Sequence, residues 1–255
     1  MLSYCHAGGT EEPSRTMPWG AWTAFGLLIS GSASAVLLAG EPASSAPAQG
    51  LRLPATFLGV LPCADCPGIR NHLDLWADGV FHLRREWLGP KDLIRDDIGR
   101  WTLDAARNAI VLRGGAEMPL QFEIVGPLQL RALDTSGGRI ESHLPYELKS
   151  NGTLTPTVVS LTLNGEMRYM ADAATFIECL TGRRYPIATE RAYPDLEAGY
   201  LKAVREPGAA LYVSFEGSIV ERRKMEGKGT QPTVVVRHYI KASPGASCER
   251  TAGGH

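Results

Sequence analysis

The stretch LDLWADGVFHLRREWLG, residues 73–89, consists of two segments in which apolar and polar residues alternate. Leu73 and Leu75 share one face of the first segment, and the same alternation begins again at Phe81. Asp78-Gly79 lies between the two segments, and this dipeptide favours a tight turn between paired strands. The stretch therefore predicts an antiparallel β-hairpin.

The surrounding sequence repeats this pattern. RWTLDAARNAIVLRGG, residues 100–115, predicts a second hairpin, in which Trp101 and Leu103 face apolar residues across the turn. A third is expected from LQFEIVGPLQLRAL through the turn residues 134–138. Between residues 56 and 148 no segment has a sustained helical period. Six or more short strands joined by short turns predict a small closed or nearly closed antiparallel barrel.

A polar stretch rich in turn formers, residues 149–156, predicts a domain boundary. Beyond it, residues 158–188 predict two or three strands, punctuated by Asn164-Gly165 and Thr181-Gly182. A helix is predicted over residues 194–204, and two further strands follow it. This order suits a five-stranded OB-like barrel. The predicted fold class is all-β and mainly antiparallel, with domains over residues 51–150 and 151–255.

The first fifty residues differ from the rest of the chain. Residues 16–40 contain no charged side chain, and a run rich in Ala, Ser and Pro follows. This composition predicts an export signal and spacer over residues 1–50, with Met17 as an alternative start. A membrane-spanning helix is the competing interpretation, but the small and polar residues of 30–34 make it a poor span.

The end of this segment resembles a bacterial lipoprotein signal in all but one residue. Leu37-Leu38-Ala39-Gly40 is followed by Glu41, where a lipoprotein has the cysteine that carries the lipid. Without a thiol no thioether to diacylglycerol can form, so we do not expect a lipid anchor. The leader therefore predicts an exported protein, and the sequence leaves membrane attachment open.

Composition and motifs argue against several functions. The 255-residue chain has a formal net charge of -1, which provides no field to attract nucleic acid. Motifs of the GxGxxG, Walker and GxSxG types are absent from the sequence, so nucleotide binding and serine hydrolase chemistry lack support. The adjacent acids Asp96 and Asp97 are interpreted as a solvated turn. We therefore propose no catalytic residue from these patterns.

The cysteines are the residues that bear chemistry. Removing the leader takes Cys5 away and leaves four cysteines, which in an oxidising compartment favours two disulfides. Four cysteines permit three pairings. Pairing Cys63 with Cys66 and Cys179 with Cys248 demands the least of the fold.

The C-x-x-C stretch LPCADCPG, residues 61–68, has three competing interpretations. Two thiolates at this spacing can bind Cu(I) when reduced, because soft ligands select that ion and few are needed. The plain alternative is a small disulfide that closes a loop. A thioredoxin-like redox motif is the weakest, because that chemistry needs a helix after the cysteines and Pro67-Gly68 precedes a strand here.

Long blocks of the sequence resemble the NlpE family of envelope lipoproteins. ATFLGVLPCADCPGI (residues 55–69), LDLWADGVFHLRREWLG (73–89) and IGRWTLD (98–104) are similar to the N-terminal domain of that family. YMADAATFIECLTGRRYPIA (169–188) and AYPDLEAGYLKA (192–203) are similar to its second domain.

The resemblance implies a lipocalin-like barrel followed by an OB-like barrel with one helix. The family's C-x-x-C matches Cys63 and Cys66, as a metal or redox site, and its C-terminal disulfide matches Cys179 and Cys248. It further implies that the protein is not an enzyme, and that it acts in copper homeostasis or resistance and in envelope-stress signalling, in the periplasm or cell envelope of a Gram-negative bacterium. The implied partners are copper, as Cu(I), and the periplasmic domain of a Cpx-type sensor kinase.

Two alternatives to this reading stay open. One is a carrier that holds an apolar ligand in a roomy barrel, and the other is a thiol-disulfide redox protein. An interior plugged by Trp76, Phe81 or Trp101 would favour the sensor over the carrier.

Overall fold

The computed structural model describes residues 50–248 apart from 90–92, 117, 172 and 225–226. The predicted export signal, its alternative start and Glu41 lie outside the described residues. Within them, no helix is both long and apolar enough to cross a membrane.

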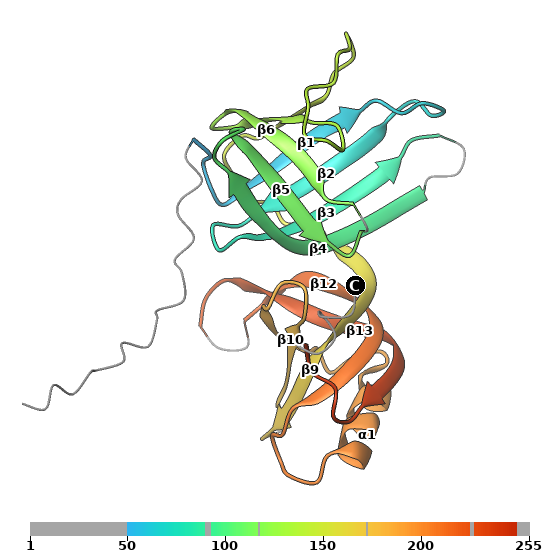
Figure 1. Cartoon of the computed structure of the whole chain (residues 1–255). Helices are drawn as coiled ribbons and strands as arrows, with labels where there is room; N and C mark the ends of the chain where they lie inside the picture. The colour runs from blue at the N-terminus through green and yellow to red at the C-terminus, as the bar shows by residue number, and fades with distance from the viewer. Residues whose placement is uncertain (1–49, 90–92, 117, 172, 225–226, 249–255) are drawn as a thin grey trace, which may run out of the picture. The chain divides into compact units, whose positions relative to one another are not determined.

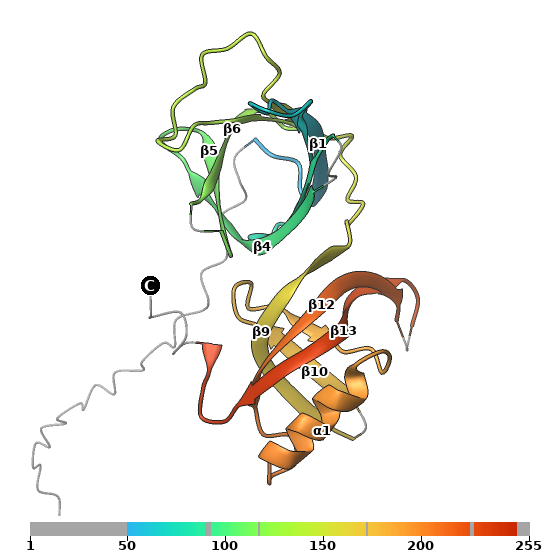
Figure 2. The same ribbon diagram turned by 90° about the vertical axis from the view of Figure 1, so that its right-hand side faces the viewer.

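The N-terminal half forms a closed barrel of eight strands (Figure 2). Each strand pairs antiparallel with the next, and β8 returns to pair with β1 through Leu58 and Lys149. The predicted small antiparallel barrel is confirmed. Its strands are β1 (Ala55–Leu61), β2 (Ile69–Leu75), β3 (Val80–Trp87), β4 (Leu93–Asp104), β5 (Ala109–Gly114), β6 (Leu120–Gly126), β7 (Gln129–Ala132) and β8 (Glu147–Lys149).

Two of the three predicted hairpins form as expected. The turn at Asp78-Gly79 joins β2 to β3, and Trp101 lies opposite Leu112 in the β4–β5 hairpin. The third differs, because LQFEIVGPLQLRAL is itself a hairpin, β6–β7, that turns at Pro127-Leu128. Residues 134–138 instead lie in the connection between β7 and β8. Proline cannot donate a backbone hydrogen bond, which suits it to the turn.

The C-terminal half is a five-stranded antiparallel sheet with one helix (Figure 1). A parallel bridge between Ile187 and Val234 draws the two ends of the sheet together, as a partly open OB-type barrel requires. The predicted helix forms with bounds shifted by one residue. In sheet order the strands are β11 (Arg184–Pro186), β10 (Ala173–Glu178), β9 (Val159–Met170), β12 (Leu211–Arg223) and β13 (Thr230–Ser243), and the helix is α1 (Tyr193–Ala203).

The expected break at Asn164-Gly165 is wrong. β9 runs through both residues without interruption. A Cβ atom at Gly165 would lie 2.1 Å from the carbonyl oxygen of Ile177 on β10. The glycine is therefore explained by close approach of the neighbouring backbone rather than by a turn.

The barrel is filled by side chains over most of its length. Phe57, Phe81 and Trp101 are buried in one apolar cluster with the leucines and isoleucines that alternate along the strands. Trp76 is not part of that cluster; its ring lies against the ring of His82, with centroids 4.7 Å apart. Of the three proposed plugs, Phe81 and Trp101 occupy the interior.

Candidate functional site

The C-x-x-C motif forms the connection between β1 and β2. The last pair of that ladder is Leu61 with Ile69, so residues 62–68 make the loop. Pro62 and Pro67 at its two ends lack backbone donors, which keeps the loop out of the sheet. The carbonyl of Gly68 accepts a hydrogen bond from the backbone N–H of Leu88, 2.9 Å away, which fixes the end of the loop to the β3–β4 side.

Cys63 and Cys66 are joined by a disulfide, with their Cα atoms 5.2 Å apart. Both are half-buried, while Ala64 and Asp65 between them are exposed. In the described structure no backbone hydrogen bond links one residue of 62–67 to another. The β1–β2 ladder holds the two ends of the loop together, and the disulfide is the cross-link between residues inside it.

The loop is better suited to a metal ion that needs only two ligands than to an ion that needs three or four. In the part of the chain that the structure describes, no group of three or more His, Cys, Asp or Glu side chains is arranged to hold a metal. After reduction the two sulfurs would supply a pair of soft donors from neighbouring positions, and such a pair fits Cu(I). The strand β2, rather than a helix, follows Cys66, so the arrangement that activates a thioredoxin-type thiolate is missing.

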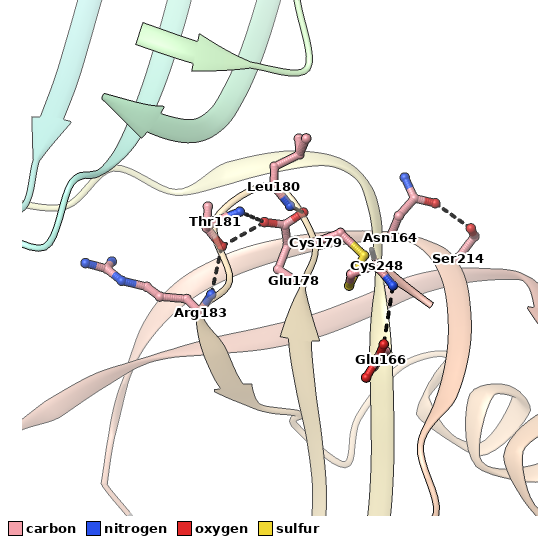
Figure 3. Close-up of a disulfide and its surroundings, with 9 residues drawn as sticks. All are labelled: Asn164, Glu166, Glu178, Cys179, Leu180, Thr181, Arg183, Ser214 and Cys248. Atoms are coloured by element: carbon pink, nitrogen blue, oxygen red, sulfur yellow. Dashed lines mark hydrogen bonds between the residues drawn. A yellow bond between two sulfur atoms is a disulfide. The ribbon is translucent and has the colours of Figure 1, made fainter. Parts of the chain in front are cut away.

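The second pair, Cys179–Cys248, joins the end of β10 to the segment after β13 (Figure 3). The backbone N–H of Cys179 donates to the carbonyl of Asn164, 3.0 Å away, on β9. The backbone N–H of Cys248 donates to the carboxylate of Glu166, 3.3 Å away, on the same strand. The pair thus ties the C-terminal segment to the middle of the sheet.

A buried carboxylate shapes the turn that carries Cys179. Glu178 is 2% exposed, and it accepts hydrogen bonds from the backbone N–H groups of Leu180 and Thr181 and from the Thr181 hydroxyl (Figure 3). Burial raises the pKa of Glu178, and these donors oppose the rise. The side chain is a positioning group for the disulfide, and the sequence alone gave no sign that it would be buried.

The sequence also did not predict the contacts that hold the boundary segment. Asp74 on β2 is fully buried and accepts hydrogen bonds from the Thr56 hydroxyl at 2.5 Å and from the backbone N–H of Thr157 at 2.8 Å. His72 lies 3.2 Å from the same carboxylate and 3.0 Å from the carbonyl of Thr155. The segment predicted as a linker is therefore bound along the outside of the barrel.

The interpretation of Asp96 and Asp97 as a solvated turn is wrong. Both lie in β4. Asp96 forms a two-pronged ion pair with Arg84 on β3, and its carboxylate is almost fully buried. Asp97 is 7% exposed and accepts a hydrogen bond from the backbone N–H of Gly115. These partners come from neighbouring strands, which a local sequence pattern does not reveal.

Two family models match the chain, one in each half. The family model for the NlpE N-terminal domain matches residues 57–143, and the one for the NlpE C-terminal OB domain matches residues 157–249. Lipoprotein NlpE of Escherichia coli is 34% identical over 174 residues, which cover 67% of this chain and 72% of that protein. The crystal structure of the Cpx pathway activator NlpE from Escherichia coli is 29% identical, with a TM-score of 0.33, and the match covers 77% of this chain and 99% of that one.

The two family matches fall on the two halves described above, one on the barrel and one on the sheet with its helix. The identity to the curated relative extends over most of both proteins. The chain belongs to the NlpE family.

Proposed function

We propose that the protein is a non-catalytic component of the cell envelope that links copper and oxidation state to a stress response of the Cpx type. The Cys63–Cys66 loop is the proposed site of copper binding or redox sensing, and Cys179–Cys248 stabilises the C-terminal half. Similarity to a Cpx pathway activator supports the signalling role. The observation that carries the site is a half-buried cysteine pair on a loop cross-linked by its own disulfide.

Each state of the pair would have a different effect on the loop. The oxidised sulfurs are bonded to each other and have no thiolate to offer a metal. Reduction would free the loop and expose two donors that select Cu(I). The state of this pair therefore decides between a closed loop and a loop that binds the ion, and a partner that contacts the rim of the barrel would distinguish the two.

Titration of the reduced protein with Cu(I), in competition with a chelator, tests the site. We expect one ion to bind the wild type, and Cys63→Ser/Cys66→Ser to lose that binding. Cys179→Ser/Cys248→Ser is the matched control, because it removes two thiols elsewhere and should still bind. Equal binding by the wild type and Cys63→Ser/Cys66→Ser would overturn the proposed copper site.

The signalling role has its own experiment. In a host without its own NlpE, raised expression of this chain should increase the output of a Cpx-dependent reporter, and deletion of the sensor kinase should abolish the increase. An unchanged reporter, with the protein present in the envelope, would reject the signalling role while leaving the copper site standing.

A further inference from the structure

A cavity of about 230 Å³ lies in the barrel beside the cysteine loop. Leu61 and Pro62, which lead into Cys63, form part of its wall. Exposed residues of the β7–β8 connection, Asp134 and Thr135, also line it, so the cavity opens to solvent. The wall is mostly apolar and includes Ile69, Leu120, Phe122, Ala132, Ile140 and Tyr146.

The position of the cavity follows from the topology. In a barrel whose strands each pair with the next, alternate connections lie at the same end. The β1–β2 loop and the β7–β8 connection therefore share one rim, and the cavity lies beneath them. Phe81 and Trp101 fill the barrel further in, so the space is a pocket at the mouth and not a channel.

Arg85 is the charged side chain that enters this pocket from β3. Side chains on one face of a strand are two residues apart, and Phe81 and Leu83 point into the barrel core. Arg85 continues that face and lines the cavity. Its Nε atom is buried and has no hydrogen-bond partner. Buried polar groups in proteins are nearly always paired, so this nitrogen, like the unpaired Oε1 of Gln121 on the same wall, is open to a group that enters the pocket.

The neighbours of Arg85 do not supply that partner. Asp97 lies near enough to affect it electrostatically, but its carboxylate accepts a hydrogen bond from Gly115, and among the described residues Arg85 forms no ion pair. Trp87 stacks on both Arg85 and Arg95, so a second cation lies close by. The charge of Arg85 thus remains available to an anion that enters from the mouth.

We propose that this pocket binds a small amphiphilic anion, whose carboxylate pairs with Arg85 and whose short apolar chain lies against Phe122 and Ala132. Because a cavity of about 150 Å³ holds benzene, this one has room for a ligand of about eight heavy atoms. Hexanoate, with eight heavy atoms, has this size. The rim carboxylate of Asp134 accepts hydrogen bonds from Ser136 and Gly138 and repels an anion, so the attraction that holds the ligand comes from Arg85.

Titration of the full oxidised chain with sodium hexanoate, followed by two-dimensional NMR, tests the proposal. We expect saturable shifts confined to residues that line the cavity. Hexanol has the same chain without the charge and should bind at least tenfold more weakly. Shifts elsewhere, or equal affinity for hexanol, would overturn the proposal, and this comparison needs no variant.

Three variants sharpen the test. Arg85→Gln removes the charge and should weaken hexanoate binding at least tenfold. Ala132→Leu fills the cavity and should abolish binding while Arg85 remains. Arg70→Gln is the matched control, because Arg70 is an exposed arginine on the outer face of β2 and pairs with Glu86. Its affinity should equal that of the wild type. Retained binding in folded Arg85→Gln or Ala132→Leu would contradict the assignment.

Discussion

His82 shows how one buried side chain makes the barrel sensitive to acid. It is 2% exposed, and its Nε2 atom has no hydrogen-bond partner. Burial lowers the pKa of His82 to about 4. As the pH falls, His82 therefore takes up a proton near pH 6.5 in the unfolded chain but only near pH 4 in the folded chain. The contribution of neutral His82 to the unfolding free energy is fully present above pH 6.5 and is lost as the pH falls from 6.5 toward 4.

We predict that replacing His82 flattens this dependence. The wild type should lose about 2–3 kcal/mol of unfolding free energy from this group between pH 7 and pH 4.5, at 1.36 kcal/mol for each unit of pKa shift. His82→Phe should not show that loss. Urea unfolding at the two pH values measures the difference, with exposed His143→Ala as the control. An identical slope in wild type and His82→Phe would refute the assignment.

His72 titrates in the opposite sense. Burial lowers its pKa, but the hydrogen bond and charge of Asp74 and the carbonyl of Thr155 outweigh burial, so that the pKa is raised overall. Its contribution to stability is present below pH 6.5 and is lost as the pH rises through the folded value. Measuring the unfolding free energy of separate His72 and His82 variants at the same pH distinguishes the contributions of the two histidines.

Asp74 explains why the boundary segment lies on the barrel, because it accepts a hydrogen bond from Thr157. The sequence pattern did not predict that this carboxylate is buried. Alternation with Leu73 and Leu75 correctly puts it on the outer face, where a carboxylate is usually solvated. Only packing of distant residues such as Thr157 buries it. The same holds for Arg85, whose charge lies on a face that its neighbours make apolar.

We predict that Asp74→Asn destabilises the barrel by about 2–3 kcal/mol, because it removes the charge that accepts hydrogen bonds from Thr56 and Thr157. Segment 150–158 should become more sensitive to proteases. Chemical unfolding and limited proteolysis measure the two effects. Exposed Glu141→Gln, which also removes one negative charge, should change neither.

At the scale of elements, alternation and turn chemistry predicted two of the three hairpins, and the helical spacing of apolar residues predicted the helix. The pattern failed where a residue has two common uses. Gly165 lies within β9. The Asn-Gly dipeptide often makes a turn, but here the glycine lets the backbone of β10 approach closely. Pro127-Leu128 makes the turn that was expected further along the chain. Local sequence cannot choose between these uses, because the deciding atom belongs to another strand.

The packing at Gly165 gives a prediction for the β9–β10 pair. Gly165→Ala would place a methyl group 2.1 Å from the Ile177 carbonyl, so the strands must separate. We expect a loss of about 2–3 kcal/mol, typical of an overpacked site. Thermal unfolding measures it. Gly126→Ala is the control, because no atom lies within 4 Å of the added carbon, and it should unfold near the wild-type temperature.

The two disulfides should differ in their contribution to stability. Cys179 and Cys248 are 69 residues apart and Cys63 and Cys66 only three, so loop closure predicts about 4 kcal/mol for the first and about 2 kcal/mol for the second. We predict a larger fall in unfolding temperature for Cys179→Ser/Cys248→Ser than for Cys63→Ser/Cys66→Ser. The reverse order would show that the C-terminal bond is not the main staple.

For the whole molecule, the cysteine pairs connect structure to cellular location. Disulfides persist in exported proteins and are rare in a reducing cytoplasm. We predict that protein recovered from the envelope of its host carries both bonds, and that the same chain made in a reducing cytoplasm carries four free thiols in its mature part. Intact-mass measurement with and without a thiol-alkylating reagent distinguishes these states. Free thiols at Cys179 and Cys248 in the envelope form would contradict the proposed staple, whereas free thiols at Cys63 and Cys66 alone would be the proposed reduced, copper-binding form.

The two halves also differ in how well their architecture could be predicted. Regular hairpins with short turns predicted the barrel, because each strand pairs with its neighbour in sequence. The C-terminal sheet places β9 between β10 and β12, with α1 and β11 intervening in sequence, so the order of elements predicted an OB-like barrel but not its strand order. The cavity could not be predicted from the sequence, because volume depends on how side chains from several strands fill a common space.

Closure of the barrel has a consequence for solubility. A ring of strands offers no unpaired backbone edge to another molecule, whereas β13 runs for 14 residues and ends its sheet. Beyond Val236 its backbone pairs with β12 alone among the described strands. If molecules of this protein associate edge to edge, we therefore expect β13 to supply the pairing strand.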